Sequence, residues 1–132
     1  MKKIHLIGLG LLGGSFALAA KQKFPELVLT GQDTNPQHLQ DALALGIISE
    51  VTSGPDADTD LVILATPANS LGDLLLKTLD QIETNTLVFD LGSTKAKLCA
   101  AVASHPKSHN TSQLTPSQAR SIQAQKLLLQ PC

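Results

Sequence analysis

Short apolar runs alternate with longer stretches of helical composition along most of the chain. Five of these runs are expected to form strands, at 3–7, 27–30, 47–51, 61–65 and 87–89. The stretches between them are expected to form helices, at 11–23, 36–45, 70–82 and 94–104. The run at 61–65 is apolar without alternation, which is typical of a parallel strand covered on both faces. Strands that alternate with helices predict a parallel α/β sheet with right-handed crossovers.

Glycine spacing marks the first junction between a strand and a helix. Gly8, Gly10 and Gly13 form the pattern G-x-G-x-x-G, and Leu11 and Leu12 stand before its third glycine. The dinucleotide-binding fingerprint requires this position between strand and helix. Its first glycine allows a tight turn, its second lets a pyrophosphate approach the backbone, and its third lets helix and strand pack closely. The N–H groups and the dipole of the helix face the anion. The pattern predicts a Rossmann-like sheet, and a purely structural turn is the alternative.

A carboxylate follows the second expected strand. Asp33 lies twenty residues after Gly13, where the fingerprint places an acid that accepts hydrogen bonds from the adenosine ribose hydroxyls. A 2′-phosphate about 4 Å away would meet a repulsion of about 4 kcal/mol at an effective dielectric near 20. The next residues, Thr34 and Asn35, include no arginine to offset that repulsion. Asp33 therefore favours NAD over NADP as the cofactor, and a helix cap is a further role compatible with this one.

Two more strand ends are expected at the same crevice, because ligands in open α/β sheets sit outside the carboxyl ends of the strands. Ala65, Thr66 and Pro67 end the fourth run and would lie along the nicotinamide side, with a plain turn as the alternative. Gly92 and Ser93 follow the fifth run. The Ser93 hydroxyl either caps the next helix or faces the substrate.

Composition narrows the class of protein. The chain has 132 residues, 42% of them apolar, and is long enough for one domain that buries about two-thirds of its surface. It has no Trp or Tyr, so it lacks the aromatic platforms of single-strand binders. All eleven acidic residues fall within 1–90, and the five cations of 91–132 are too dispersed to form a patch. We therefore expect no nucleic-acid partner.

Cysteine usage and hydropathy favour a cytoplasmic protein. Cys99 and Cys132 lie far apart, which fits neither a disulfide framework nor a zinc site, and we expect reduced thiols and no metal. The N-terminal run imitates a secretory signal in part, but His5 and the glycines interrupt it. No other window reaches the roughly 18 apolar residues of a membrane span, so no membrane partner is expected.

Three strings in combination resemble the prephenate/arogenate dehydrogenase family of tyrosine biosynthesis, over about residues 1–110. They are G-L-G-L-L-G-G-S at 8–15, D-L-V-I-L-A-T-P at 60–67 and D-L-G-S-T-K at 90–95. The resemblance implies NAD-dependent oxidative decarboxylation of prephenate or arogenate. A ring carbon gives a hydride to NAD while carbon dioxide leaves. The resemblance also implies that Ser93 corresponds to the family's serine near the substrate hydroxyl. A non-catalytic NAD-binding or redox-sensing module is the alternative function.

The resemblance implies a sixth strand and a further domain, and the sequence of this chain matches neither. Family members continue with a sixth strand that ends in H-P-x-A-G, whose histidine polarises the substrate hydroxyl. A helical dimerisation domain then completes the substrate site of a homodimer. We therefore expect a sheet of about five strands without the sixth, and a chain that supplies the cofactor domain and is inactive alone. His105-Pro106 arrives too early to be that motif, so His105 and His109 are expected to be exposed to solvent.

The residues after Asn110 can be reread in a shifted frame. The third base of each codon, joined to the first two bases of the next, can encode V-A-A-H-P-I-A-G-T-E-Y-S-G-P-K-A-A-L-A-A-L from Thr111 onward. This string contains the family motif in register. We therefore divide the chain into a dinucleotide-binding domain at 1–110 and a frameshifted tail at 111–132, expected to be poorly ordered or loosely helical.

Overall fold

The computed structural model describes residues 3–66, 71–83, 86–91 and 95–113. Six strands form one sheet in the order β3-β2-β1-β4-β5-β6, and every neighbouring pair is parallel. The strands are β1 (Lys3–Ile7), β2 (Val28–Gln32), β3 (Glu50–Val51), β4 (Leu61–Leu64), β5 (Leu87–Asp90) and β6 (Thr111–Gln113). Because β1 lies between β2 and β4, the chain reverses its direction of travel across the sheet there, which opens a crevice at the carboxyl ends of these strands.

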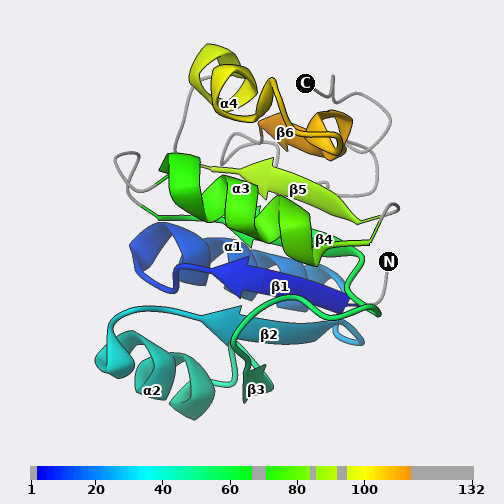
Figure 1. Ribbon diagram of the computed structural model, residues 1–132. Helices are drawn as coiled ribbons and strands as arrows, with labels where there is room; N and C mark the ends of the chain where they lie inside the picture. The colour runs from blue at the N-terminus through cyan, green and yellow to red at the C-terminus, as the bar shows by residue number, and fades with distance from the viewer. Residues whose placement is uncertain (1–2, 67–70, 84–85, 92–94, 114–132) are drawn as a thin grey trace.

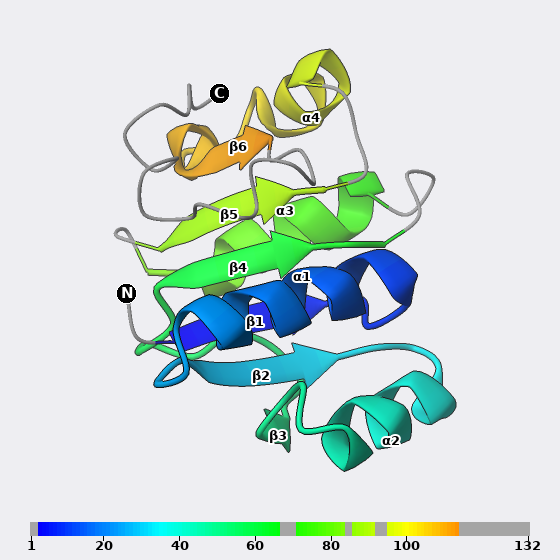
Figure 2. The same cartoon turned by 180° about the vertical axis from the view of Figure 1, so that it is seen from behind.

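Helices cover both faces of this sheet. They are α1 (Leu11–Lys23), α2 (Pro36–Ala44), α3 (Leu71–Gln81) and α4 (Lys95–Val102), with a short 3₁₀ helix, η2 (Ser108–Asn110). Figure 1 shows α3 in front of the sheet, and Figure 2, from behind, shows α1 across the opposite face. The prediction of a Rossmann-like α/β fold is confirmed.

Strand β4 lies inside the sheet and corresponds to the unbroken apolar run of the sequence at 61–65. All four of its side chains are fully buried. Leu61 and Ile63 pack into the core beneath α1, with Phe16 and Leu29, whereas Val62 and Leu64 pack into the core beneath α3. Alternate residues of a strand point to opposite faces, so a central strand between two helical layers needs apolar side chains at every position.

The prediction that the sixth strand is missing is wrong. Thr111, Ser112 and Gln113 pair in parallel register with Val88, Phe89 and Asp90. An edge strand is held by backbone hydrogen bonds to one neighbour, which any non-proline residue can make. The approach to β6 is fixed by Asn110, whose buried side chain donates to the Thr86 carbonyl at 2.7 Å. The sheet therefore extends three residues beyond the predicted domain boundary at 110.

Two smaller expectations are also corrected. Cys99 in α4 is disulfide-bonded, so the expectation of a reduced thiol is wrong at this position. The His105 side chain is only 13% exposed, because its Nε2 lies 2.8 Å from Asp80 Oδ1 and its Nδ1 accepts from the Lys107 N–H. The side chain of His109 and residues 114–132 lie outside the described residues. Within the described ranges, no helix has both the length and the apolar character that crossing a membrane requires.

Candidate cofactor site

The glycine turn after β1 is packed so closely that two of its glycines leave no room for a side chain. Gly8 has a φ of +100°, and a Cβ there would lie 2.7 Å from the Ala65 carbonyl oxygen. A Cβ on Gly13 would lie 2.0 Å from the Gly8 carbonyl oxygen. Gly8 therefore allows the turn beside β4, and Gly13 allows α1 to start directly against that turn.

Gly10 differs from its neighbours because its side is open. The nearest atom to a Cβ built there is His38 Cε1, at an ordinary contact distance of 3.8 Å. Gly10 is the N-cap residue of α1 and supplies no side chain to its N–H groups. Leu11 and Leu12 begin the helix, and their side chains lie outside the described atoms. The turn thus leaves helix N–H groups beside an unobstructed glycine, an arrangement that suits a phosphate group.

Asp33 links the glycine turn to the helix that follows β2. Its Oδ2 accepts from the Leu9 N–H at 2.7 Å and lies 3.0 Å from His38 Nδ1, and its Oδ1 accepts from the Asn35 N–H at 2.8 Å. Burial alone would raise the pKa of the Asp33 carboxyl, but hydrogen bonds from Asn35, Leu9 and His38 hold the pKa below its ordinary value. Asp33 is therefore a carboxylate at neutral pH.

The cap of α2 is a different residue. The Asn35 side chain accepts from the Gln37 N–H at 3.0 Å and caps the helix, with Pro36 in its first turn. The interpretation of Asp33 as the cap is wrong, since Asn35 holds that position and Asp33 instead accepts from the Asn35 and Leu9 N–H groups.

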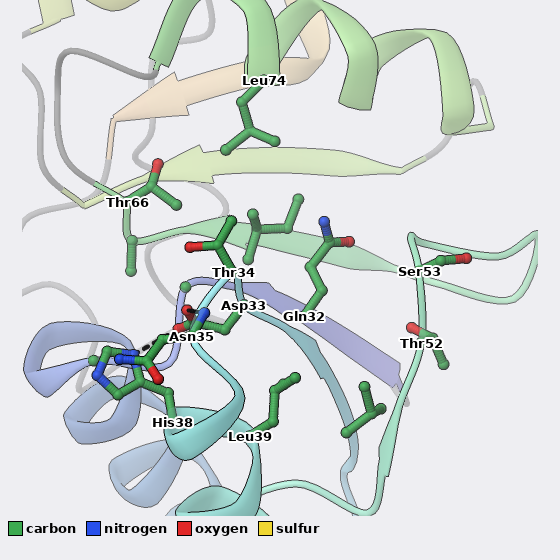
Figure 3. A pocket seen from close by; sticks show the side chains of 15 residues that line it. Gln32, Asp33, Thr34, Asn35, His38, Leu39, Thr52, Ser53, Thr66 and Leu74 are labelled. Carbon is green, nitrogen blue, oxygen red and sulfur yellow. Dashed lines mark hydrogen bonds and ion pairs between the residues drawn. The ribbon is translucent and has the colours of Figure 1, made fainter.

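A pocket of about 820 Å³ lies over these groups, at the carboxyl ends of β1, β2 and β4 (Figure 3). Five of the predicted site residues line it: Gly8, Gly10, Asp33, Ala65 and Thr66. Gly13 lies beneath the turn rather than in the pocket. Pro67, Gly92 and Ser93 lie outside the described residues. The described lining contains no Lys or Arg to offset the charge of Asp33.

The pocket has a polar wall that the sequence did not reveal. His5 is fully buried in the middle of β1, where its Nδ1 lies 2.8 Å from Thr30 Oγ1 and its Nε2 lies 2.7 Å from Gln32 Oε1. Thr52 Oγ1 approaches the same Nδ1 at 3.3 Å. Burial lowers the pKa of His5, so the ring is neutral at neutral pH, donates from Nε2 to Gln32 and accepts at Nδ1 from the Thr30 hydroxyl, while the Thr52 hydroxyl donates to the Gly54 carbonyl. His5 therefore holds Gln32 at the edge of the pocket.

Two further contributions were missed. The Leu9 N–H is a direct donor to Asp33, and the Leu9 side chain packs over Gly31, where a Cβ would come within 2.9 Å of its Cδ1. His38 lies beside both Asp33 and Gly10. The sequence offered one weak signal, Gly31 directly after the predicted strand at 27–30, because a glycine in or beside a strand indicates close approach of another group.

Comparisons with known proteins agree on the kind of domain. Residues 16–118 match the family described as "Prephenate dehydrogenase, nucleotide-binding domain". The chain is 38% identical over 103 residues to prephenate dehydrogenase of Lactococcus lactis, and 38% identical over 101 residues to that of Bacillus subtilis. These matches cover 74% and 72% of the chain but only 28% and 27% of the relatives.

Solved structures show the same fold. Prephenate dehydrogenase from Aquifex aeolicus, in complex with hydroxyphenyl propionate and NAD+, superposes with a TM-score of 0.74 at 24% identity, over 86% of this chain and 41% of that one. Arogenate dehydrogenase from Synechocystis has a TM-score of 0.62 at 22% identity, over 90% of this chain and 38% of that one.

Proposed function

The chain belongs to the prephenate dehydrogenase family, whose nucleotide-binding domain it matches, and we propose that its pocket binds NAD. The sequence-based identification of this family of NAD-dependent dehydrogenases is confirmed. The observation that carries the proposal is a pocket lined by Gly8, by Gly10 with its open side and by the charged Asp33, above a turn that Gly13 allows to pack closely.

Each part of the pocket suits a part of the dinucleotide. The pyrophosphate would lie against Gly10 and the first turn of α1, whose N-cap has no side chain. The adenosine ribose hydroxyls would donate to the Asp33 carboxylate. Beyond it, Leu39 and Val51 offer apolar surface for the adenine ring, and the amide of Gln32 borders that region. Ala65 and Thr66, at the end of β4, would border the path toward the nicotinamide.

The charge of Asp33 supports NAD rather than NADP. A 2′-phosphate would have to approach a carboxylate whose pKa lies below its ordinary value, in a pocket without Lys or Arg among its described lining. At about 4 Å and an effective dielectric near 20, the repulsion is about 4 kcal/mol.

For the whole protein, we propose NAD-dependent oxidative decarboxylation of prephenate or arogenate. This chain would contribute the cofactor domain, with the Ser93 hydroxyl facing the substrate. NAD, when bound, accepts the hydride, while the residues described here bind and orient it. The chain spans about a quarter of the length of these relatives, and dimerisation and a cytoplasmic location are proposed with this activity for the whole protein.

Titration calorimetry with NAD and NADP tests the cofactor. We expect NAD to bind at least about tenfold more tightly, and an Asp33→Asn variant to lose most of that preference. Asp73→Asn, an acid in the first turn of α3 and outside the pocket lining, is the matched control and should keep it. Equal affinity of the wild-type chain for both cofactors would remove the role of Asp33. Absence of binding by either would overturn the proposal.

A further inference from the structure

The Asp33 carboxylate has little bonding capacity left. A carboxylate offers about four lone-pair positions, two on each oxygen. Its Oδ2 has two neighbours, the Leu9 N–H at 2.7 Å and His38 Nδ1 at 3.0 Å, and its Oδ1 accepts from the Asn35 N–H at 2.8 Å. The two backbone donors belong to the turns that build the site. The imidazole is the only side chain among these three donors.

A ribose diol needs more than this carboxylate has free. Its two hydroxyls each require a lone pair, and bidentate recognition places one hydroxyl on each carboxylate oxygen. With His38 in place, Oδ1 retains one position and Oδ2 retains none. The Asp33 side chain is only 9% exposed, whereas the His38 side chain is 41% exposed and lines the pocket. The His38 imidazole therefore occupies, from the pocket, the Oδ2 position that a second ribose hydroxyl would need.

We propose that His38 competes with the adenosine ribose for Asp33 Oδ2, so that the free chain occupies its own ribose site and a bound nucleotide displaces the imidazole. This inference rests on the proposed binding of NAD in the pocket. It assigns His38 as a residue that sets cofactor affinity, a role apart from those of the glycine turn and Asp33.

The surroundings of His38 allow this displacement. The residue lies in the first turn of α2 and also lines a neighbouring groove of about 250 Å³ between α1 and α2, together with Leu18 and Asp41. An imidazole that leaves Asp33 can turn toward that groove, where the Asp41 carboxylate lies on the same helix.

Binding of ADP and of 2′,3′-dideoxy-ADP by calorimetry tests the inference, because the two probes differ only in the ribose hydroxyls. We expect His38→Leu to bind ADP about three- to tenfold more tightly than the wild-type chain. In the variant, ADP does not have to break the hydrogen bond between His38 and Asp33 before it binds. Affinity for 2′,3′-dideoxy-ADP should stay within about twofold, since that probe makes no demand on Asp33. A second substitution, His38→Ala, should behave in the same way.

Gln37→Leu is the matched control. Gln37 occupies the same turn of α2, but its side chain bonds Asp41 at 2.9 Å rather than Asp33. This control should bind both probes as the wild-type chain does. Unchanged or weaker ADP binding by both His38 variants, or an equal gain for both probes, would overturn the competition. Failure of the wild-type chain and all variants to bind ADP or NAD would instead overturn the proposed function on which it rests.

Discussion

Gly10 has room for a side chain in the free chain, whereas Gly13 does not. Among the described residues, a Cβ on Gly10 meets nothing closer than 3.8 Å, but one on Gly13 would lie 2.0 Å from the Gly8 carbonyl oxygen. We predict that Gly10→Val folds normally and loses about 30-fold or more in NAD affinity, roughly 2 kcal/mol, because the side chain keeps the pyrophosphate from the backbone. Calorimetry measures the affinity, and thermal unfolding measures the fold.

Gly13→Val is the contrasting variant. It should lower the melting temperature strongly, because neither the turn nor the start of α1 can yield to the new side chain. If Gly10→Val bound NAD as the wild-type chain does, the pyrophosphate would have to lie elsewhere. If the two variants unfolded alike, the distinction between an open glycine and a packed glycine would be wrong.

His5 should make the stability of the domain depend on pH. Burial lowers its pKa in the folded chain below the ordinary value of about 6.5, so below that pH the unfolded chain binds a proton that the folded chain does not. The free energy of unfolding therefore falls as the pH drops below about 6.5, and this contribution levels off once the pH lies below the folded pKa. Each unit of difference between the two pKa values accounts for up to about 1.4 kcal/mol.

Urea unfolding at several pH values measures this effect. His5→Gln keeps an amide that can donate to Gln32 and accept from Thr30, but it does not titrate. We expect the wild-type chain to lose more stability on acidification than the variant does. Equal pH dependence in the two proteins would show that His5 contributes nothing to it.

Site residues that belong to a local sequence motif could be predicted, whereas hydrogen bonds between residues far apart in the sequence could not. Gly8, Gly10, Gly13 and Asp33 were predicted because each occupies a fixed place in a local pattern. The bond from the Leu9 N–H to Asp33 spans 24 residues, and the partly buried contact of His5 with Gln32 spans 27. Such contacts depend on strand register and side-chain rotamers, for which a single sequence carries no local signal.

Elements with strong hydrophobic patterns were predicted closely, and the edge strand was missed. Helix α1 begins and ends at the predicted residues, and β4 and β5 differ from prediction by one residue at one end. Strand β6 has the sequence Thr-Ser-Gln and so lacks an apolar pattern. It forms because β5 presents a free row of backbone groups, and because Thr111 is buried next to the Asn110 contact with Thr86.

Two truncations test where the folded domain ends. A chain that ends after Gln113 keeps β6, and we predict NAD affinity within about threefold of that of the full chain. A chain that ends after Asn110 loses β6 and exposes the edge of β5, which should lower the free energy of unfolding by roughly 1–3 kcal/mol and promote self-association. Both are compared with the full chain in the presence of a thiol reductant, because each removes Cys132 and Cys99 is disulfide-bonded. Equal stability of the two truncated chains would make β6 dispensable.

At the scale of the whole molecule, the position of β6 bears on the shifted reading frame. Gln113 of β6 pairs with Asp90 of β5, and Asp90 pairs with Leu64 of β4. The three strands therefore end at the same edge of the sheet, which holds the pocket. One base inserted after the Asn110 codon makes a new codon 111 with the first two bases of the Thr111 codon, so V-A-A falls at positions 112–114 and the histidine at 115, two residues after the carboxyl end of β6. The resemblance to the family requires its histidine at the end of the sixth strand, and the shifted frame supplies it next to this end.

We therefore predict that insertion of one base after the Asn110 codon yields a longer, dimeric protein that reduces NAD in the presence of prephenate or arogenate. The 132-residue chain, assayed alongside it by NADH absorbance, should bind NAD but produce no NADH. A positioned acid–base partner contributes about 10²–10⁴-fold to a rate, and the positioning supplied by a further domain adds to this. Two results would contradict the prediction: a stop codon immediately after the insertion, or NADH formation by the 132-residue chain at a rate like that of the restored protein.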